Sequence, residues 1–175
     1  GGTFLNAGTL TYTADGNLGL AGSRNITFGG AATLVGFSGS SLNTLTVNVG
    51  AVGTLSAHGY TFATTTGSGT LSYFPNATNS AVTNLGNAST YTGNIAALMG
   101  GNTNASPVLQ FSAINDAAGS ALQFGGNNTD SQQNVTIRYL GTAALVFNNR
   151  SIELLAPFGA NNTVSFAIVQ NNSVS

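Results

Sequence analysis

Short segments with an apolar residue at every second position run through most of the chain, with Thr, Ser or Asn between them. Leu45–Val49 and Val164–Ile168 show the pattern most clearly. A period of two is that of a strand with one face buried, and the β-branched and aromatic content agrees with it. We expect strands there and at Thr9–Tyr12, Asn25–Phe28, Ala32–Val35, Gly53–Ser56, Tyr60–Phe62, Gly69–Tyr73, Ala121–Phe124, Val135–Arg138, Ala144–Phe147 and Ser151–Leu154.

Gly and Asn, which tolerate tight corners, separate these segments at intervals of about 8 to 11 residues, typical of a β-sandwich or a β-solenoid. A sandwich sheet facing water normally carries Lys, Glu and Arg. Here 4% of the residues are charged, and Thr, Ser and Asn can stack in ladders on successive coils without like-charge repulsion. We therefore predict an all-β parallel β-helix (β-solenoid), with a pilus-like β-sandwich as the alternative. Coil length is expected to vary, since Ile26 to Leu45 spans 19 positions and Leu34 to Leu55 spans 21.

The alternation fades between residues 75 and 107, where Asn residues are frequent. We expect a single solenoid segment over residues 1–175 with a less regular part at 75–107. Ile95–Met99 fits one helical turn, which is too short to be stable on its own.

The scarcity of ionisable residues argues against whole classes of function. Three basic residues give little electrostatic support for binding nucleic acid or an anionic membrane. The absence of cysteine excludes disulfides and thiolate metal sites. No apolar run approaches the roughly 18 to 20 residues of a membrane span, so we expect no membrane insertion by this segment. No cofactor is predicted.

The few ionisable side chains offer one candidate cluster. A β-helix that cleaves polysaccharides needs grouped carboxylates with a basic partner, and Asp116, Asp130 and either Arg138 or Arg150 would be that group. The favoured interpretation is that each acid is a separate surface or turn residue, including Asp15 and Glu153. His58 has no second ligand at metal-binding spacing. We predict no catalytic, cofactor-binding or metal site.

Asn-x-Ser/Thr triplets are more frequent than chance would give. In a host that glycosylates asparagine, sugars would supply the hydration that charged residues do not; elsewhere these residues would serve in turns and ladders. The possible acceptors are Asn25, Asn76, Asn87, Asn104, Asn127, Asn134, Asn149, Asn161 and Asn171.

One stretch resembles a known repeat. Ala88-Ser89-Thr90-Tyr91-Thr92-Gly93-Asn94 is similar to the N-T-Y-T-G-x-T signature of bacterial autotransporter-associated β-strand repeats, with Ala-Ser in place of the usual Asn-Thr lead-in. Much of the chain shares the Gly/Thr/Asn-rich style of such passenger regions. The resemblance implies a right-handed β-helix exported to the cell surface, and it implies no catalytic residues.

Together these features predict a non-catalytic extracellular or cell-surface structural protein: a stalk, fibre or matrix component, with roles such as adhesion or biofilm matrix. It would self-associate or belong to a longer chain, and its partners would be copies of itself, with glycans as a further candidate. Two alternatives remain open. One is a pilus-like subunit that polymerises by donating a strand, from Phe4–Leu5 or Val164–Val174. The other is a β-helix that binds or cleaves carbohydrate.

Overall fold

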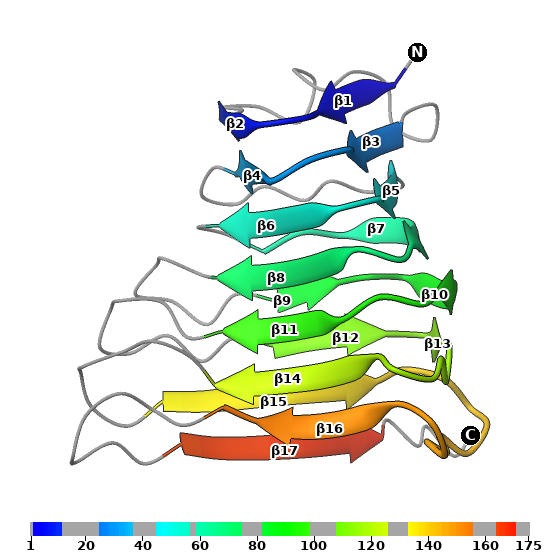
Figure 1. Cartoon of the computed structure of the whole chain (residues 1–175). Helices are drawn as coiled ribbons and strands as arrows, with labels where there is room; N and C mark the ends of the chain where they lie inside the picture. The colour runs from blue at the N-terminus through cyan, green and yellow to red at the C-terminus, as the bar shows by residue number, and fades with distance from the viewer. Residues whose placement is uncertain are drawn as a thin grey trace.

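The chain winds as a right-handed parallel β-helix in the computed structural model (Figure 1). The structure describes residues 2–11, 25–36, 45–56, 59–74, 82–98, 108–125, 133–155 and 164–170. In Figure 1 the nearer strands run right to left and those behind them left to right as the chain descends from the N-terminus, which is a right-handed turn. The predicted fold is confirmed. The β-sandwich alternative is wrong, because sandwich sheets are antiparallel, whereas every strand pairing among the described residues is parallel.

Three sheets form the walls of the coil, and we call them A, B and C. Sheet A contains β1 (Thr3–Leu5), β3 (Asn25–Phe28), β5 (Leu45–Val49), β7 (Phe62–Gly67), β10 (Asn87–Tyr91) and β13 (Ala113–Ile114). Sheet B contains β2 (Gly8–Thr11), β4 (Ala32–Val35), β6 (Val52–Ser56), β8 (Thr70–Phe74), β11 (Ile95–Leu98), β14 (Ala121–Gly125) and β16 (Ser151–Leu154). Sheet C contains β9 (Val82–Asn84), β12 (Val108–Phe111), β15 (Gln133–Tyr139) and β17 (Val164–Gln170). Among the described residues, sheet B alone reaches from the first coil to the last.

Coil length changes along the axis. The prediction that Leu34 and Leu55 occupy equivalent places is confirmed, because they pair across sheet B. Ile26 pairs with Val47 and not with Leu45, so the expected spacing of 19 was wrong and this coil also spans 21 positions. The spacing falls to 17 where Leu45 pairs with Phe62 and rises to 31 where Gln133 pairs with Val164.

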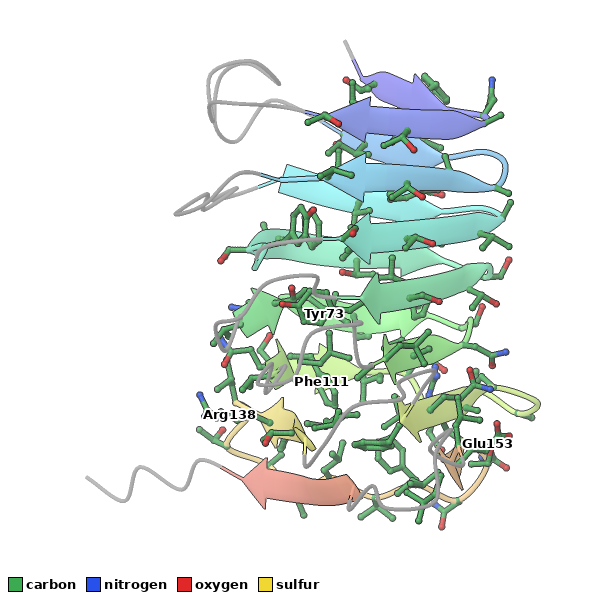
Figure 2. The ribbon with its side chains drawn as sticks, turned by 90° about the vertical axis from the view of Figure 1, so that its left-hand side faces the viewer. Tyr73, Phe111, Arg138 and Glu153 are labelled. Carbon is green, nitrogen blue, oxygen red and sulfur yellow. The ribbon has the colours of Figure 1, made fainter. Side chains whose placement is uncertain are left out.

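Inward positions of the strands form a continuous apolar column. On sheet B, paired positions from β4 downward carry buried Leu34, Leu55, Tyr73, Ala97 and Phe124. Figure 2 shows Tyr73 and Phe111, from sheets B and C, inside the coil. Both rings belong to a single cluster of buried apolar side chains that runs along the axis.

Outward positions of the upper coils form uncharged ladders, as predicted. One column of sheet B reads Thr9, Thr33, Thr54 and Ser72, in that order. Sheet A carries two such columns, one of Asn25, Thr46, Thr64 and Asn87 and one of Thr27, Asn48, Thr66 and Thr90. Rungs of a sheet lie about 4.8 Å apart, a spacing at which stacked charges would repel each other and short polar side chains do not.

Two local expectations were wrong. Ala144–Phe147 is not a strand, although Leu145 and Phe147 pack partly against the core. Its neighbour in sheet A, β13, has only two residues, which leaves little edge for a further strand to pair with. Ile95–Leu98 is strand β11 and not a helical turn, because it pairs on both sides, with β8 and with β14. The described residues of the Asn-rich stretch, 82–98, include strands β9, β10 and β11, and the pairing of β10 with β7 shifts register between Asn87 and Thr90.

Candidate functional site

One charged side chain, that of Arg150, is buried where sheet A turns into sheet B. The side chain of Arg150 is 4% exposed. Its Nε donates to the carbonyl of Asn115 at 2.8 Å, Nη1 to that of Gly93 at 2.8 Å, and Nη2 to that of Tyr91 at 3.1 Å. A longer contact, 3.5 Å, joins Nη1 to the carbonyl of Ala121. The planar guanidinium therefore binds backbone oxygens of two coils that lie above its own.

This environment has opposing effects on the Arg150 charge. Burial lowers the pKa of Arg150, while the nearby Tyr91 hydroxyl and the Asp116 carboxylate raise it. Free arginine has a pKa above about 12, so the side chain stays protonated. The carbonyl dipoles around it replace the water that the charge lost on burial, and this is what makes a buried arginine tolerable here.

A carboxylate fixes the backbone that precedes Arg150. Oδ1 of Asp116 accepts from the backbone N–H of Arg150 at 2.8 Å, and its Oδ2 accepts from that of Asn148 at 2.9 Å. The Asn149 N–H reaches Oδ1 at 3.1 Å, and the Asn149 side chain donates to Oδ2 at 3.1 Å. Three successive N–H groups turned toward one anion form a concave nest. These donors, the Arg150 N–H first, lower the pKa of Asp116.

The coil above contributes a second fixed point at the same corner. The hydroxyl of Tyr91 lies 2.6 Å from the carbonyl of Gly69 and 2.8 Å from that of Asn94. Gly93 also belongs to this corner, because a Cβ there would collide with the Gly69 carbonyl. Asn94 links this corner to the next coil, because its Oδ1 accepts a hydrogen bond from the backbone N–H of Ala121 at 2.9 Å. Tyr91, Gly93 and Asn94 belong to the stretch that resembles the autotransporter-associated repeat, and in this chain they form the corner.

Burial also controls the tyrosine hydroxyls. It raises the pKa of Tyr91 far above its ordinary value, against smaller lowering effects of a backbone hydrogen bond at Leu71 and of the Arg150 charge. Burial raises the pKa of Tyr73 to about 12, partly opposed by the Thr83 hydroxyl. That hydroxyl is close enough to act on the pKa but makes no hydrogen bond of good geometry, so the buried Tyr73 oxygen has no partner among the described residues.

The remaining ionisable side chains do not assemble into a cluster. Nη1 of Arg138 donates to Oε1 of Gln110 at 3.4 Å on sheet C, and Oε2 of Glu153 accepts from Gln123 at 2.8 Å on sheet B. Figure 2 shows Arg138 and Glu153 on opposite sides of the molecule. Asp15, Arg24, His58 and Asp130 lie outside the described residues. Within the described part, Asp116 and Arg150 come together, through the arginine backbone, and no group of three or more His, Cys, Asp or Glu side chains is placed to hold a metal ion.

Two of the Asn-x-Ser/Thr residues share one outward column of sheet A. Asn25 and Asn87 are exposed, with Thr46 and Thr64 between them on successive rungs. The Asn87 side-chain oxygen accepts the backbone N–H of Ser89 at 3.0 Å, which closes an Asx turn and leaves Nδ2 pointing elsewhere.

The third described acceptor side chain is held differently. Asn149 is exposed, yet its Nδ2 donates to Asp116 as part of the nest. Asn134 lies in β15, and its side chain is outside the described set. The other predicted acceptors lie outside the described residues: Asn76, Asn104, Asn127, Asn161 and Asn171.

Sequence reasoning did not find the corner. It treated Arg150 as a candidate partner of carboxylates and named Tyr91 only within the repeat-like stretch, whereas both side chains bind backbone carbonyls. The one available signal was the Tyr-Thr-Gly of the repeat-like stretch, which marks Tyr91 but not Arg150.

Comparison with known proteins returned no relative: no family model, no curated protein and no solved structure matches the chain. In the residues that the structure describes, no helix is long and apolar enough to cross a membrane.

Proposed function

We propose that this chain is a non-catalytic structural segment of an extracellular or cell-surface protein, acting as part of a stalk, fibre or matrix. The observation that carries the proposal is the combination of uncharged outward ladders with a corner bonded across successive coils. Nearly all hydrogen-bonding capacity of the corner is used inside the molecule. Such a molecule serves as a durable spacer and not as a reagent.

Three further features support this proposal. The apolar interior is continuous along the axis, so each coil stabilises its neighbours as in other solenoids. The carboxylate of Asp116 is occupied by backbone N–H groups and the guanidinium of Arg150 by carbonyls, which leaves neither free to act on a substrate. The resemblance of the Tyr91 stretch to an exported repeat favours the cell surface.

Surface labelling of the source cells tests this proposal. An antibody raised against the folded chain should label intact cells or the material between them, and a broad protease added outside should remove the signal. An antibody against a cytoplasmic protein is the matched control and should bind only after permeabilisation. If the chain behaves like that control, the extracellular role is wrong.

A further inference from the structure

The last strand of sheet B leaves its inward side chains uncovered. Ile152 is 44% exposed and Leu154 59% exposed. Leu122 and Phe124 hold the same register positions one coil above, and each is 1% exposed. Among the described residues no strand pairs with the lower edge of β16, whereas every inward position of this sheet from β4 to β14 lies between two paired strands.

The first strand of sheet B has the complementary shape. In the column that ends at Ile152, the top positions hold Gly8, Ala32 and Gly53, and the larger Leu71 follows below them. In the neighbouring inward column, Leu10 of β2 is only half-buried. A strand that placed a glycine beside Ile152 and a leucine beside Leu154 would extend both columns. Its side chains would have sizes that already occur in those columns.

We propose that a second copy of this chain stacks head to tail on the first, with its β2 pairing in parallel with β16. The register places Gly8 beside Ile152, Thr9 beside Glu153 and Leu10 beside Leu154. This inference rests on the proposed structural function and names the surface through which it would assemble. Sheet B is the sheet that has described strands at both ends, so the junction continues sheet B and adds one rung.

The electrostatics of the two edges favour this occupant. Natural edge strands are commonly protected by charged side chains, above all lysine. β2 has no charged residue and β16 has one, Glu153, which would face the uncharged Thr9. The whole chain has a net charge of −1, so two copies approach with little mutual repulsion.

The absence of cysteine allows a direct test of the register. In the Thr9→Cys/Glu153→Cys double variant, the two new thiols face each other only across the proposed junction, at a Cα separation within disulfide range. Oxidation of the 175-residue chain should give a ladder of covalent oligomers in denaturing electrophoresis. The control Thr27→Cys/Glu153→Cys carries its first thiol on sheet A and should give no ladder beyond random dimers. Equal cross-linking of the two variants overturns the register.

Charge placed on the edge provides the second test. Sedimentation velocity of the wild-type chain should show association that increases with concentration, and Ile152→Lys should shift it at least tenfold toward monomer. Val82→Lys changes a residue of similar exposure, 42%, on sheet C and should leave association unchanged. Circular dichroism establishes that both variants keep the β-fold. A wild-type chain that stays monomeric at every concentration overturns the inference, even where surface labelling supports the proposed function.

Discussion

The backbone carbonyl of Tyr91 accepts a hydrogen bond from Nη2 of Arg150 at 3.1 Å, while the hydroxyl of the same tyrosine lies 2.6 Å from the Gly69 carbonyl. Gly69 precedes β8, Tyr91 ends β10 and Arg150 precedes β16, so this relay extends over four successive coils. The coil between those of Tyr91 and Arg150 also takes part, because Arg150 binds the carbonyl of Asn115. One corner of the solenoid is therefore held by side chains as well as by strand pairing.

Replacing the buried guanidinium should destabilise the C-terminal coils. Arg150→Lys keeps the charge but offers a single ammonium group, which cannot reach three carbonyls in a fork. We expect a loss of about 2 to 4 kcal/mol in the free energy of unfolding, because buried acceptors lose their donors. Urea unfolding followed by circular dichroism measures this loss. Arg138→Lys, whose native side chain makes one 3.4 Å contact on sheet C, is the control and should change stability by less than about 0.5 kcal/mol.

Two buried tyrosines should respond in opposite ways to loss of the hydroxyl. Tyr91→Phe removes the donor to the Gly69 and Asn94 carbonyls and should cost about 1 to 2 kcal/mol. Tyr73→Phe removes a buried oxygen without a hydrogen-bond partner among the described residues, so its stability should stay equal or rise. Thermal unfolding of the two variants gives the comparison. A greater loss for Tyr73→Phe than for Tyr91→Phe would contradict the assigned hydrogen bonds.

Acid should loosen the nest around Asp116. The pKa of this carboxyl is lowered in the folded chain, chiefly by the Arg150 N–H. The ionised form of Asp116 therefore stabilises the folded state more than its protonated form does. The stabilisation is present above the ordinary aspartate pKa of about 3.9 and is lost as the pH falls through the lower folded value. The urea midpoint should fall over that range in the wild-type chain. In Asp116→Asn it should already be lower at neutral pH, and its acid dependence should be weaker.

The folded structure should rank the candidate glycosylation sites. We expect a soluble N-glucosyltransferase with UDP-glucose to modify Asn87 readily, because its amide is exposed and Nδ2 is not held by the Asx turn. Asn149 should react slowly, because its Nδ2 donates to Asp116. Peptide mass spectrometry gives both rates. Unfolding in urea should remove the difference, and Asp116→Ala should accelerate Asn149 alone; faster reaction at Asn149 in the native chain would refute the ranking.

The fold could be predicted from the sequence because the alternation that indicates it lies within short segments of the chain. Alternation in segments such as Leu45–Val49 reports which side chains face inward, and uncharged intervening residues indicate ladders. Alternation does not report pairing. At Ala144–Phe147 a strand was expected; Leu145 and Phe147 do pack partly against the core, but the adjacent β13 is too short to support a strand.

The corner was beyond sequence reasoning for a different reason. The acceptors of Arg150 at Tyr91, Gly93 and Asn115 lie 59, 57 and 35 positions away, and all are backbone carbonyls. Every residue has a backbone carbonyl oxygen, so no pattern of residue types predicts which carbonyls a guanidinium will bind. Only the winding of the coil brings them to one place.

The uneven coil length has a consequence under tension. Because the strand-to-strand hydrogen bonds lie along the axis, a pull on the two ends opens one coil at a time instead of shearing all of them together. The spacings of 17 and 31 positions between paired residues mean that the shortest and longest described coils release different lengths of chain. At roughly 3.3 to 3.6 Å per extended residue, these are about 60 and 110 Å. The molecule would therefore yield in graded steps, and the size of each step identifies the coil that has given way.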